Sequence, residues 1–213
     1  MDGARQSPTA VFGVAVALTV VAVLENTIAP WAPFYVAYAA LATALPFVFG
    51  AVRVARPARP RVFHLLAALA LALVLQGVFR LVTSATDLPA MFGAVFTAAS
   101  ARLHRPPEVL AARYLLFIQI WAGVGEELFY RGYVQAQLRR HFGALPAIAA
   151  ASVLFAIRHY AQVLLTWPGV PWGPATVWVA ATLLVGVALG VLYERTRSLL
   201  PPILCHYVVN LLA

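Results

Sequence analysis

Apolar runs of about 20 residues recur along this chain, and they constrain its fold more than any other feature. A helix that rises about 1.5 Å per residue needs roughly 20 apolar residues to cross the roughly 30 Å hydrocarbon core of a bilayer. Seven runs approach that length, at residues 10–28, 33–52, 62–82, 109 to about 138, 144–165, 175–193 and 199–213. The sequence therefore predicts an all-α, polytopic membrane helix bundle of about seven transmembrane helices, forming a single integral membrane domain over residues 1–213.

The composition supports this prediction and excludes a soluble globular protein. Hydrophobic residues make up 63% of the 213 positions and charged residues only 10%, which is too few to coat a water-soluble core. The net charge of +8 could suggest a nucleic-acid partner, but the cations lie in short clusters between apolar runs, so none is expected. The single cysteine, Cys205, excludes a disulfide framework and a cysteine-rich metal site, and we expect it to be a buried apolar thiol.

The arginines between the runs predict the orientation of the bundle. Residues 89–101 are apolar but would extend only about 20 Å as a helix, so we interpret them as interfacial or re-entrant. The arginine clusters at 53–61, 139–140 and 195–197 then fall on one side of the membrane. The positive-inside rule makes that side cytoplasmic, with the N-terminus inside, whereas the loop from Trp167 to Trp172 lies outside. The alternative, which Arg102 and Arg105 favour, is that residues 89–101 cross the membrane and reverse the segments before them relative to those after.

Seven charged or polar residues stand out within the last four runs. A charge at the centre of a bilayer costs about 2.5–3.5 kcal/mol on insertion scales, so several unpaired charges would not be tolerated. Either these residues neutralise one another as structural links between helices, or they line a wet cavity that serves chemistry or transport. They are Glu126, Glu127, Arg131, Arg158, His159, His206 and Asn210.

Helical spacing predicts that these residues meet. Glu126 lies 16 residues before Phe142 and His159 lies 17 residues after it, so two antiparallel helices joined there would hold both side chains at one depth. Pairs spaced i, i+4 share a helix face. These pairs are Glu127 and Arg131, Phe155 and His159, and His206 and Asn210. A carboxylate, two imidazoles and a carboxamide around one small volume suit a hydrolase that activates water and stabilises an oxyanion.

Other hydrolase layouts can be excluded by motif. The sequence contains no His-Glu-x-x-His zinc pair and no Gly-x-Ser-x-Gly nucleophile turn. No aspartate follows Glu108, so an intramembrane pair of catalytic aspartates is impossible in the last four runs. A glutamate is the remaining candidate for the base.

Three segments resemble the motifs of one family of membrane proteases. They are GEELFYRG at 125–132, FAIRH at 155–159 and PPILCHYVVN at 201–210. Together they resemble the CPBP family of CAAX prenyl endopeptidase-like, bacteriocin-processing and abortive-infection intramembrane proteases. The resemblance covers residues 109–213, which would form the protease core, with 1–108 as variable N-terminal helices. It places the catalytic core in the last four helices.

The resemblance implies a role for each motif residue. Glu126 would be the general base, His159 would help to bind the attacking water, and His206 with Asn210 would stabilise the oxyanion. The family has been described both as metalloproteases and as metal-independent glutamic proteases. From the residues alone, Glu126, His159 and His206 would also suffice as a three-ligand zinc set with an open fourth position.

The remaining polar residues would support this set. Glu127 and Arg131 would form an ion pair that orients the first helix. If Glu126 were a zinc ligand, the base would have to be Glu127, which Arg131 already holds, so we expect no obligatory metal cofactor, with zinc as the alternative. Arg158 lies outside the family pattern and is either a second partner for a glutamate or a clamp for a substrate carboxylate or backbone.

We therefore expect an intramembrane endopeptidase that hydrolyses a peptide bond in a membrane-anchored or lipid-modified polypeptide by glutamate-activated water. Its partners would be that polypeptide substrate and the lipid bilayer, and its location the bacterial inner (cytoplasmic) membrane. The alternative is a non-catalytic membrane binding or immunity protein, or a small transporter, that uses the same polar cluster. An inverted repeat would favour a transporter, but the sequence shows none. The sequence sets neither the substrate nor the oligomeric state.

Overall fold

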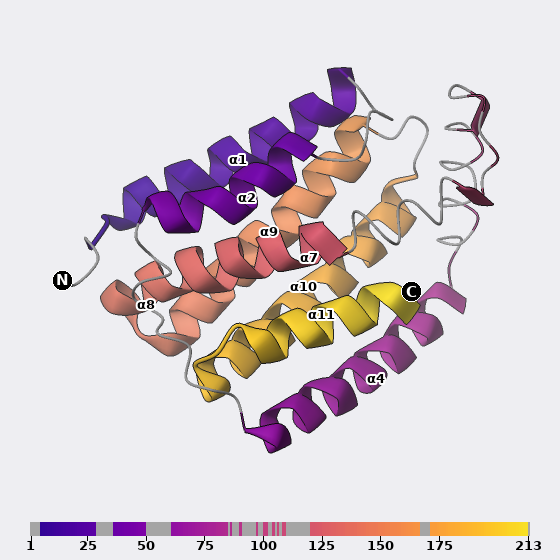
Figure 1. Ribbon diagram of the computed structural model, residues 1–213. Coiled ribbons are helices and arrows are strands. Elements are labelled where there is room, and N and C mark those ends of the chain that lie inside the picture. The colour runs from indigo at the N-terminus through magenta and orange to yellow at the C-terminus, as the bar shows by residue number, and fades with distance from the viewer. Residues whose placement is uncertain are drawn as a thin grey trace.

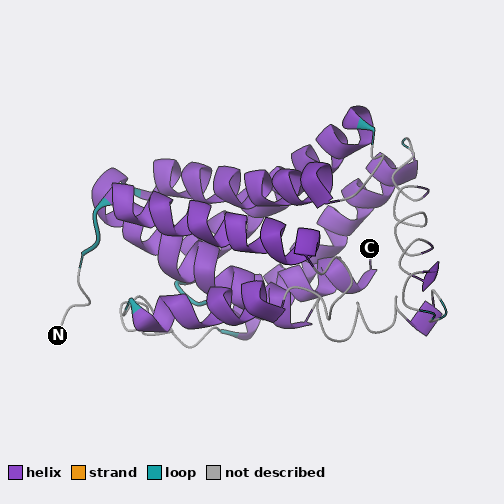
Figure 2. Cartoon of the chain, turned by 90° about the horizontal axis from the view of Figure 1, so that it is seen from above, coloured by secondary structure: helices purple, strands orange, loops and turns teal. Residues whose placement is uncertain are grey.

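The computed structural model describes residues 5–28, 36–49, 61–84, 120–166 and 171–212, together with positions 86, 90, 97, 100, 101, 104, 106, 108 and 109. Within these residues all regular secondary structure is helical, and the helices run roughly along one axis (Figures 1 and 2). The all-α class predicted from the apolar runs is confirmed for the described part of the chain.

Four of the described helices are long and apolar enough to cross a bilayer. They are α1 (Pro8–Ile28), α4 (Val62–Ser84), α9 (Ala144–Thr166) and α10 (Trp172–Thr196). Each coincides with one of the predicted apolar runs, to within a few residues at either end. The chain is therefore a helical integral membrane protein.

The other predicted spans have shorter described helices. Helices α2 (Val36–Val48) and α11 (Leu200–Leu212) are apolar but contain only 13 residues each. The run from 109 to about 138 is described continuously only from Ile120, and 89–101 lies largely outside the described residues. The total of about seven spans therefore stays a prediction, as does the re-entrant position of 89–101.

Three helical segments follow one another without a break and end at a glycine. They are α7 (Ile120–Glu126), the π-helix η2 (Glu127–Gln135) and α8 (Ala136–Phe142). Gly143 has a φ of +82°, a conformation that favours glycine, and its N–H donates to the Arg139 carbonyl at 3.1 Å. The chain then reverses into α9, as the sequence predicts for the turn after Phe142.

The packing of the helices places α7, α9 and α11 around one interior volume. Helix α9 packs against both α10 and α1, α11 packs against α4 and α10, and α2 packs against α7 and η2 (Figure 1). One apolar cluster joins α1, α2, η2, α8 and α9 around residues such as Phe129 and Tyr133. A second joins α4, α10 and α11 and includes Cys205, which is fully buried as expected.

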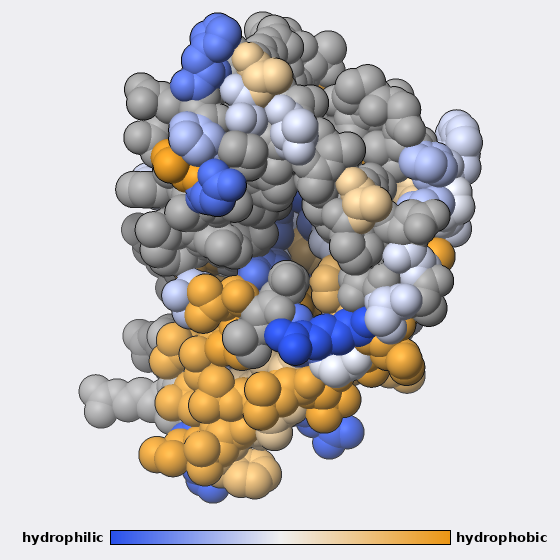
Figure 3. All heavy atoms as spheres, turned by 90° about the vertical axis from the view of Figure 1, so that its right-hand side faces the viewer, coloured by the Kyte–Doolittle hydropathy of each residue, from blue (hydrophilic) through white to orange (hydrophobic). Residues whose placement is uncertain are grey.

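The exterior of the bundle is apolar, as the surface of a protein in lipid must be. Large hydrophobic side chains such as Leu66, Leu73 and Leu81 on α4 are more than half exposed. Figure 3 shows a continuous apolar surface over the lower part of the molecule, where Figure 1 places α4. This surface faces outwards while charged side chains are buried inside, the reverse of a soluble protein.

Arginines gather at one end of the bundle. The Arg5 guanidinium donates to the carbonyl oxygen of Arg140 at 2.9 Å, which holds the start of the chain beside the end of α8. Arg139 pairs with Glu194 at 2.8 Å and joins the ends of α8 and α10. This end is the one for which the sequence predicts a cytoplasmic location, although the cluster members at 53, 56 and 59 lie outside the described residues.

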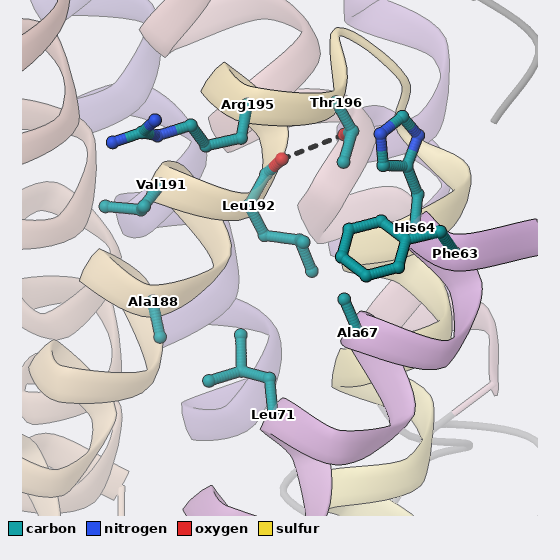
Figure 4. Close-up of a pocket in the computed structure, with 9 residues that line it drawn as sticks. All are labelled: Phe63, His64, Ala67, Leu71, Ala188, Val191, Leu192, Arg195 and Thr196. Carbon is teal, nitrogen blue, oxygen red and sulfur yellow. Dashed lines mark hydrogen bonds between the residues drawn. The ribbon is translucent and has the colours of Figure 1, made fainter. Parts of the chain in front are cut away.

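A groove of about 340 Å³ opens between α4 and α10 at the same end (Figure 4). Its walls are apolar and include Leu71 and Ala188, while His64 and Arg195 lie near its end. The groove shares no lining residue with the polar residues singled out in the sequence. It is therefore separate from the candidate site.

Candidate active site

The candidate site begins where α7 changes into the π-helix. Glu126 is the last residue of α7 and Glu127 is the first residue of η2. A π-helix has the wider i→i+5 hydrogen bonding, is rare, and occurs frequently at functional sites. The two adjacent carboxylates pair with different arginines: Glu126 with Arg158 and Glu127 with Arg131.

Glu126 is buried and has one oxygen held by two donors. Its Oε1 atom lies 2.9 Å from the Arg158 guanidinium on α9 and accepts a hydrogen bond from the Tyr38 hydroxyl on α2 at 3.3 Å. Its Oε2 atom lies 3.7 Å from Nε2 of His206 on α11. One carboxylate oxygen is therefore occupied by donors, and the other faces an imidazole.

Arg158 connects Glu126 to His159. Its Nη1 atom donates to Nε2 of His159 at 2.9 Å, while Nη2 makes the contact with Glu126. The Nδ1 atom of His159 lies 2.8 Å from the carbonyl oxygen of Phe155. A carbonyl can only accept, so Nδ1 carries the proton and Nε2 is the acceptor for Arg158. The expected proximity of Glu126 and His159 is present, with a guanidinium between them.

Glu127 lies in a second network, which is even more deeply buried. Its Oε1 atom accepts hydrogen bonds from Arg131 at 2.9 Å and from Nδ1 of His206 at 2.8 Å. Arg131 also donates to the carbonyl oxygen of Gly186 on α10 at 2.9 Å. The ion pair expected between Glu127 and Arg131 is present, and it contacts an imidazole that the sequence did not assign to it.

His206 lies between the two carboxylates and completes the buried ionic cluster. We use this name for Glu126, Glu127, Arg131, Arg158, His159 and His206. A carboxylate accepts hydrogen bonds, so Glu127 fixes the proton of His206 on Nδ1 and directs Nε2 towards Glu126. The cluster thus combines two carboxylates, two guanidiniums and two imidazoles, whose formal charges balance when the imidazoles are neutral.

Asn210 lies one turn beyond His206 on α11 and is partly buried. Its side chain makes no hydrogen bond to the described part of the chain, so the structure does not join it to the buried ionic cluster. Its position on the same helix face as His206 agrees with the i, i+4 spacing.

Tyr38 is the site residue that sequence reasoning missed. Its side chain is fully buried and its hydroxyl donates to Glu126. The Arg158 guanidinium stacks on its ring, with Cζ 4.2 Å from the ring centroid. It comes from α2, outside all three motifs. The available signal was a tyrosine in an apolar run, because a buried hydroxyl needs a polar partner.

Two local features bring Tyr38 to the site. The carboxylate of Glu25 on α1 accepts hydrogen bonds from the backbone N–H groups of Ala37 at 2.9 Å and Tyr38 at 3.0 Å, and so caps the start of α2. Gly125 lets α7 approach α2 closely, because a Cβ there would lie 2.9 Å from Oγ1 of Thr43. The N-terminal helices are thus fitted to the helix that carries Glu126.

Arg158 lies between two residues of the zinc set that the sequence left open, Glu126 and His159. Oε1 of Glu126 and Nε2 of His159 both face the Arg158 guanidinium. A Zn²⁺ ion between these ligands would lie against that cation, and like charges repel strongly in a low-dielectric interior. Among the described residues, no group of three or more histidine, cysteine or acidic side chains is arranged to hold a metal.

The long apolar helices identify an integral membrane protein, and the paired charges buried between them form an ionic site in its interior. The family model described as type II CAAX prenyl endopeptidase Rce1-like matches residues 108–212, about half of the chain. This half of the chain therefore belongs to the CPBP/CAAX family of membrane proteases, as the three motifs indicate. Searches of curated proteins and of solved structures found no match.

Proposed function

We propose that the protein is an intramembrane endopeptidase of the bacterial cytoplasmic membrane that cleaves a membrane-anchored or lipid-modified polypeptide. The observation that carries this proposal is the convergence of Glu126, Arg158 and His206 from three helices in one buried cluster. The Rce1-like match supports a prenylated polypeptide with a C-terminal CAAX sequence as the first substrate class to test.

In the proposed reaction Glu126 is the general base. Its Oε1 atom is held by Arg158 and Tyr38, so Oε2 is the oxygen that takes a proton from water as the water oxygen attacks the peptide carbonyl carbon. The carbonyl electron pair moves to its oxygen, where His206 and Asn210 would donate hydrogen bonds. When the C–N bond breaks, the proton passes from Glu126 to the leaving amine.

Glu127 would prepare His206 for this role. The Glu127 carboxylate accepts the hydrogen bond from Nδ1, so Nε2 faces the side of Glu126, and the ring can donate from Nε2 when it carries a second proton. Arg131 holds Glu127 in place. His159 holds Arg158 beside the base through Nε2. Its proposed role in binding the attacking water is indirect in this arrangement, because Nδ1 is bonded to the Phe155 carbonyl and Nε2 to Arg158.

The test is Glu126→Gln in purified protein reconstituted in vesicles. Wild-type protein should cleave a farnesylated CAAX reporter peptide, and Glu126→Gln should lose activity by about 10²–10⁴-fold, the contribution of a general base. Glu194→Gln, which changes a glutamate at the end of α10, is the matched control and should stay active. Full activity of Glu126→Gln would remove this base from the mechanism.

Substrate and metal dependence have separate tests. An unprenylated version of the reporter and an unrelated membrane-anchored peptide measure the need for the prenyl group. Wild-type protein that cleaves none of these, together with a cellular phenotype that survives loss of Glu126 and His159, would favour a binding role instead. We expect activity to survive exhaustive chelation, whereas loss on chelation and recovery with added zinc would establish a metalloprotease.

A further inference from the structure

Arg158 is the member of the buried ionic cluster that the family motifs do not explain. Only 4% of its side chain is exposed, and its charge lies beside the proposed base. It contacts Glu126 and His159, each at 2.9 Å, and stacks on Tyr38. A cation in direct contact with the groups proposed to activate water is in a position to take part in the reaction.

A clamp for the terminal carboxylate of the substrate does not fit this position. An endopeptidase cuts inside the chain, and a carboxylate three residues beyond the bond lies about 10 Å away in an extended peptide. Arg158 touches Glu126, which must itself lie within hydrogen-bond distance of the attacking water. A terminal carboxylate held by Arg158 would therefore keep the scissile bond away from the base.

The movement of charge during the reaction suggests a different role. Before the attack, the negative charge of Glu126 balances the positive charge of Arg158. When Oε2 takes the proton, Glu126 becomes neutral and the buried guanidinium loses its counter-charge, which is costly in a low-dielectric site. At the same moment a negative charge appears on the carbonyl oxygen, one water molecule away from Glu126.

We propose that Arg158 is a further catalytic residue, which donates an N–H to the oxyanion of the tetrahedral intermediate. This inference rests on the proposed function. As the carbonyl π pair moves to oxygen, the Nη2 donor shifts from Glu126 to that oxygen. When the C–N bond breaks and Glu126 returns the proton to the leaving nitrogen, the Glu126 carboxylate pairs with Arg158 again. No charge is left without a partner at any stage.

The neighbours of Arg158 hold it ready for this exchange. Nη1 is fixed by His159, whose ring is fixed in turn by the Phe155 carbonyl. The Tyr38 ring supports the flat face of the guanidinium. Donors that are already in place stabilise a developing oxyanion without reorganisation at the moment of reaction.

The first experiment measures kcat and KM for Arg158→Gln and Arg158→Lys on the reporter peptide. Loss of one oxyanion donor lowers kcat by about 10²–10³-fold, so Arg158→Gln should show this fall with little change in KM. Arg158→Lys keeps the charge and should recover part of the loss. Arg139→Gln, which removes an arginine from a partly exposed pair at the end of the bundle, should behave like wild type.

The second experiment separates catalysis from structural support. A peptide phosphonate carries a tetrahedral anion in place of the scissile carbonyl, and its affinity should fall in Arg158→Gln by the same factor as kcat/KM. Substrate binding is measured in the inactive Glu126→Gln background, where the substrate stays uncleaved. Its affinity should be nearly the same with and without Arg158→Gln. If Arg158→Gln does not fold, the same comparison in Arg158→Lys decides, with a smaller but parallel loss expected.

Unchanged kcat in Arg158→Gln, or unchanged phosphonate affinity beside a lowered kcat, would overturn the inference. Either result would leave the proposed function intact as long as wild-type protein cleaves the reporter and Glu126→Gln does not. Failure of wild-type protein to cleave any reporter would instead remove the proposed function itself.

Discussion

At the scale of single residues, burial decides what each ion pair contributes. The Glu127–Arg131 pair is 0% and 1% exposed, whereas Glu194 and Arg197 are 15% and 49% exposed. Water screens the two charges of the exposed pair, so that pair adds little stability. A buried charge that loses its partner has no water to solvate it, so the loss is costly. The two pairs therefore have opposite sensitivity to removal of one carboxylate.

Glu127→Gln should destabilise the protein by about 3–5 kcal/mol, because it leaves the Arg131 charge buried without a counter-charge. Glu194→Gln should cost about 0–1 kcal/mol, since its arginine partners are partly exposed. Unfolding in detergent micelles, followed by helical circular dichroism, measures both. If both substitutions lowered the free energy of unfolding by the same amount, the buried Glu127–Arg131 pair would not be needed for stability.

Tyr38→Phe isolates the hydroxyl that reaches Glu126, because phenylalanine keeps the ring under Arg158. Loss of a hydrogen bond to an ionised carboxylate, worth about 1.5–3 kcal/mol, should lower kcat by about 10- to 150-fold. Tyr133→Phe is the control, since that hydroxyl bonds to Gln6 near the N-terminus. Equal kcat values for the two variants would show that the Tyr38 hydroxyl does not position the base.

At the scale of elements, the sequence predicted the long helices well and their local irregularities poorly. Apolar runs of sufficient length mark α1, α4, α9 and α10, and the turn at Gly143 follows from the reversal after Phe142. The π-helix η2 has no such signal, because apolar spacing does not distinguish i→i+4 from i→i+5 bonding over nine residues. The motifs likewise predicted the cluster but not Tyr38, whose role depends on packing between distant segments.

The packing of α2 on α7 can be tested through Gly125. A Cβ at this position would lie 2.9 Å from Oγ1 of Thr43 and 3.2 Å from the carbonyl oxygen of Ala39, so Gly125→Ala should push α2 away. We expect a loss of about 1–3 kcal/mol in stability from this overpacking, together with reduced kcat as Tyr38 moves from Glu126.

Gly77→Ala is the matched control, because Gly77 also lies inside a helix and a Cβ there meets nothing within 4 Å. It should be neutral or stabilising by about 0.5–1 kcal/mol, since alanine favours a helix over glycine. The same reaction and unfolding measurements apply to both variants. A Gly125→Ala protein as stable and active as Gly77→Ala would show that close contact between α2 and α7 is not required.

At the scale of the whole molecule, the N-terminal helices are part of the site. The family match covers residues 108–212, but Glu126 receives a hydrogen bond from α2, and α2 is capped by Glu25 on α1. The sequence before residue 108 lacks a family motif, yet its helices form one wall of the interior volume. The division into variable N-terminal helices and a protease core stays a prediction.

The orientation of the bundle is testable because its one cysteine is buried. Cys205 is 0% exposed, so it should give little background with a membrane-impermeant maleimide. Ser7 and Gly173 are exposed at opposite ends, Ser7 at the arginine-rich end and Gly173 at the start of α10. The positive-inside rule places Ser7 in the cytoplasm.

Intact cells should therefore label Gly173→Cys and not Ser7→Cys, and inside-out vesicles should show the opposite pattern. Labelling of Ser7→Cys in intact cells would invert the orientation and place the arginine-rich end outside.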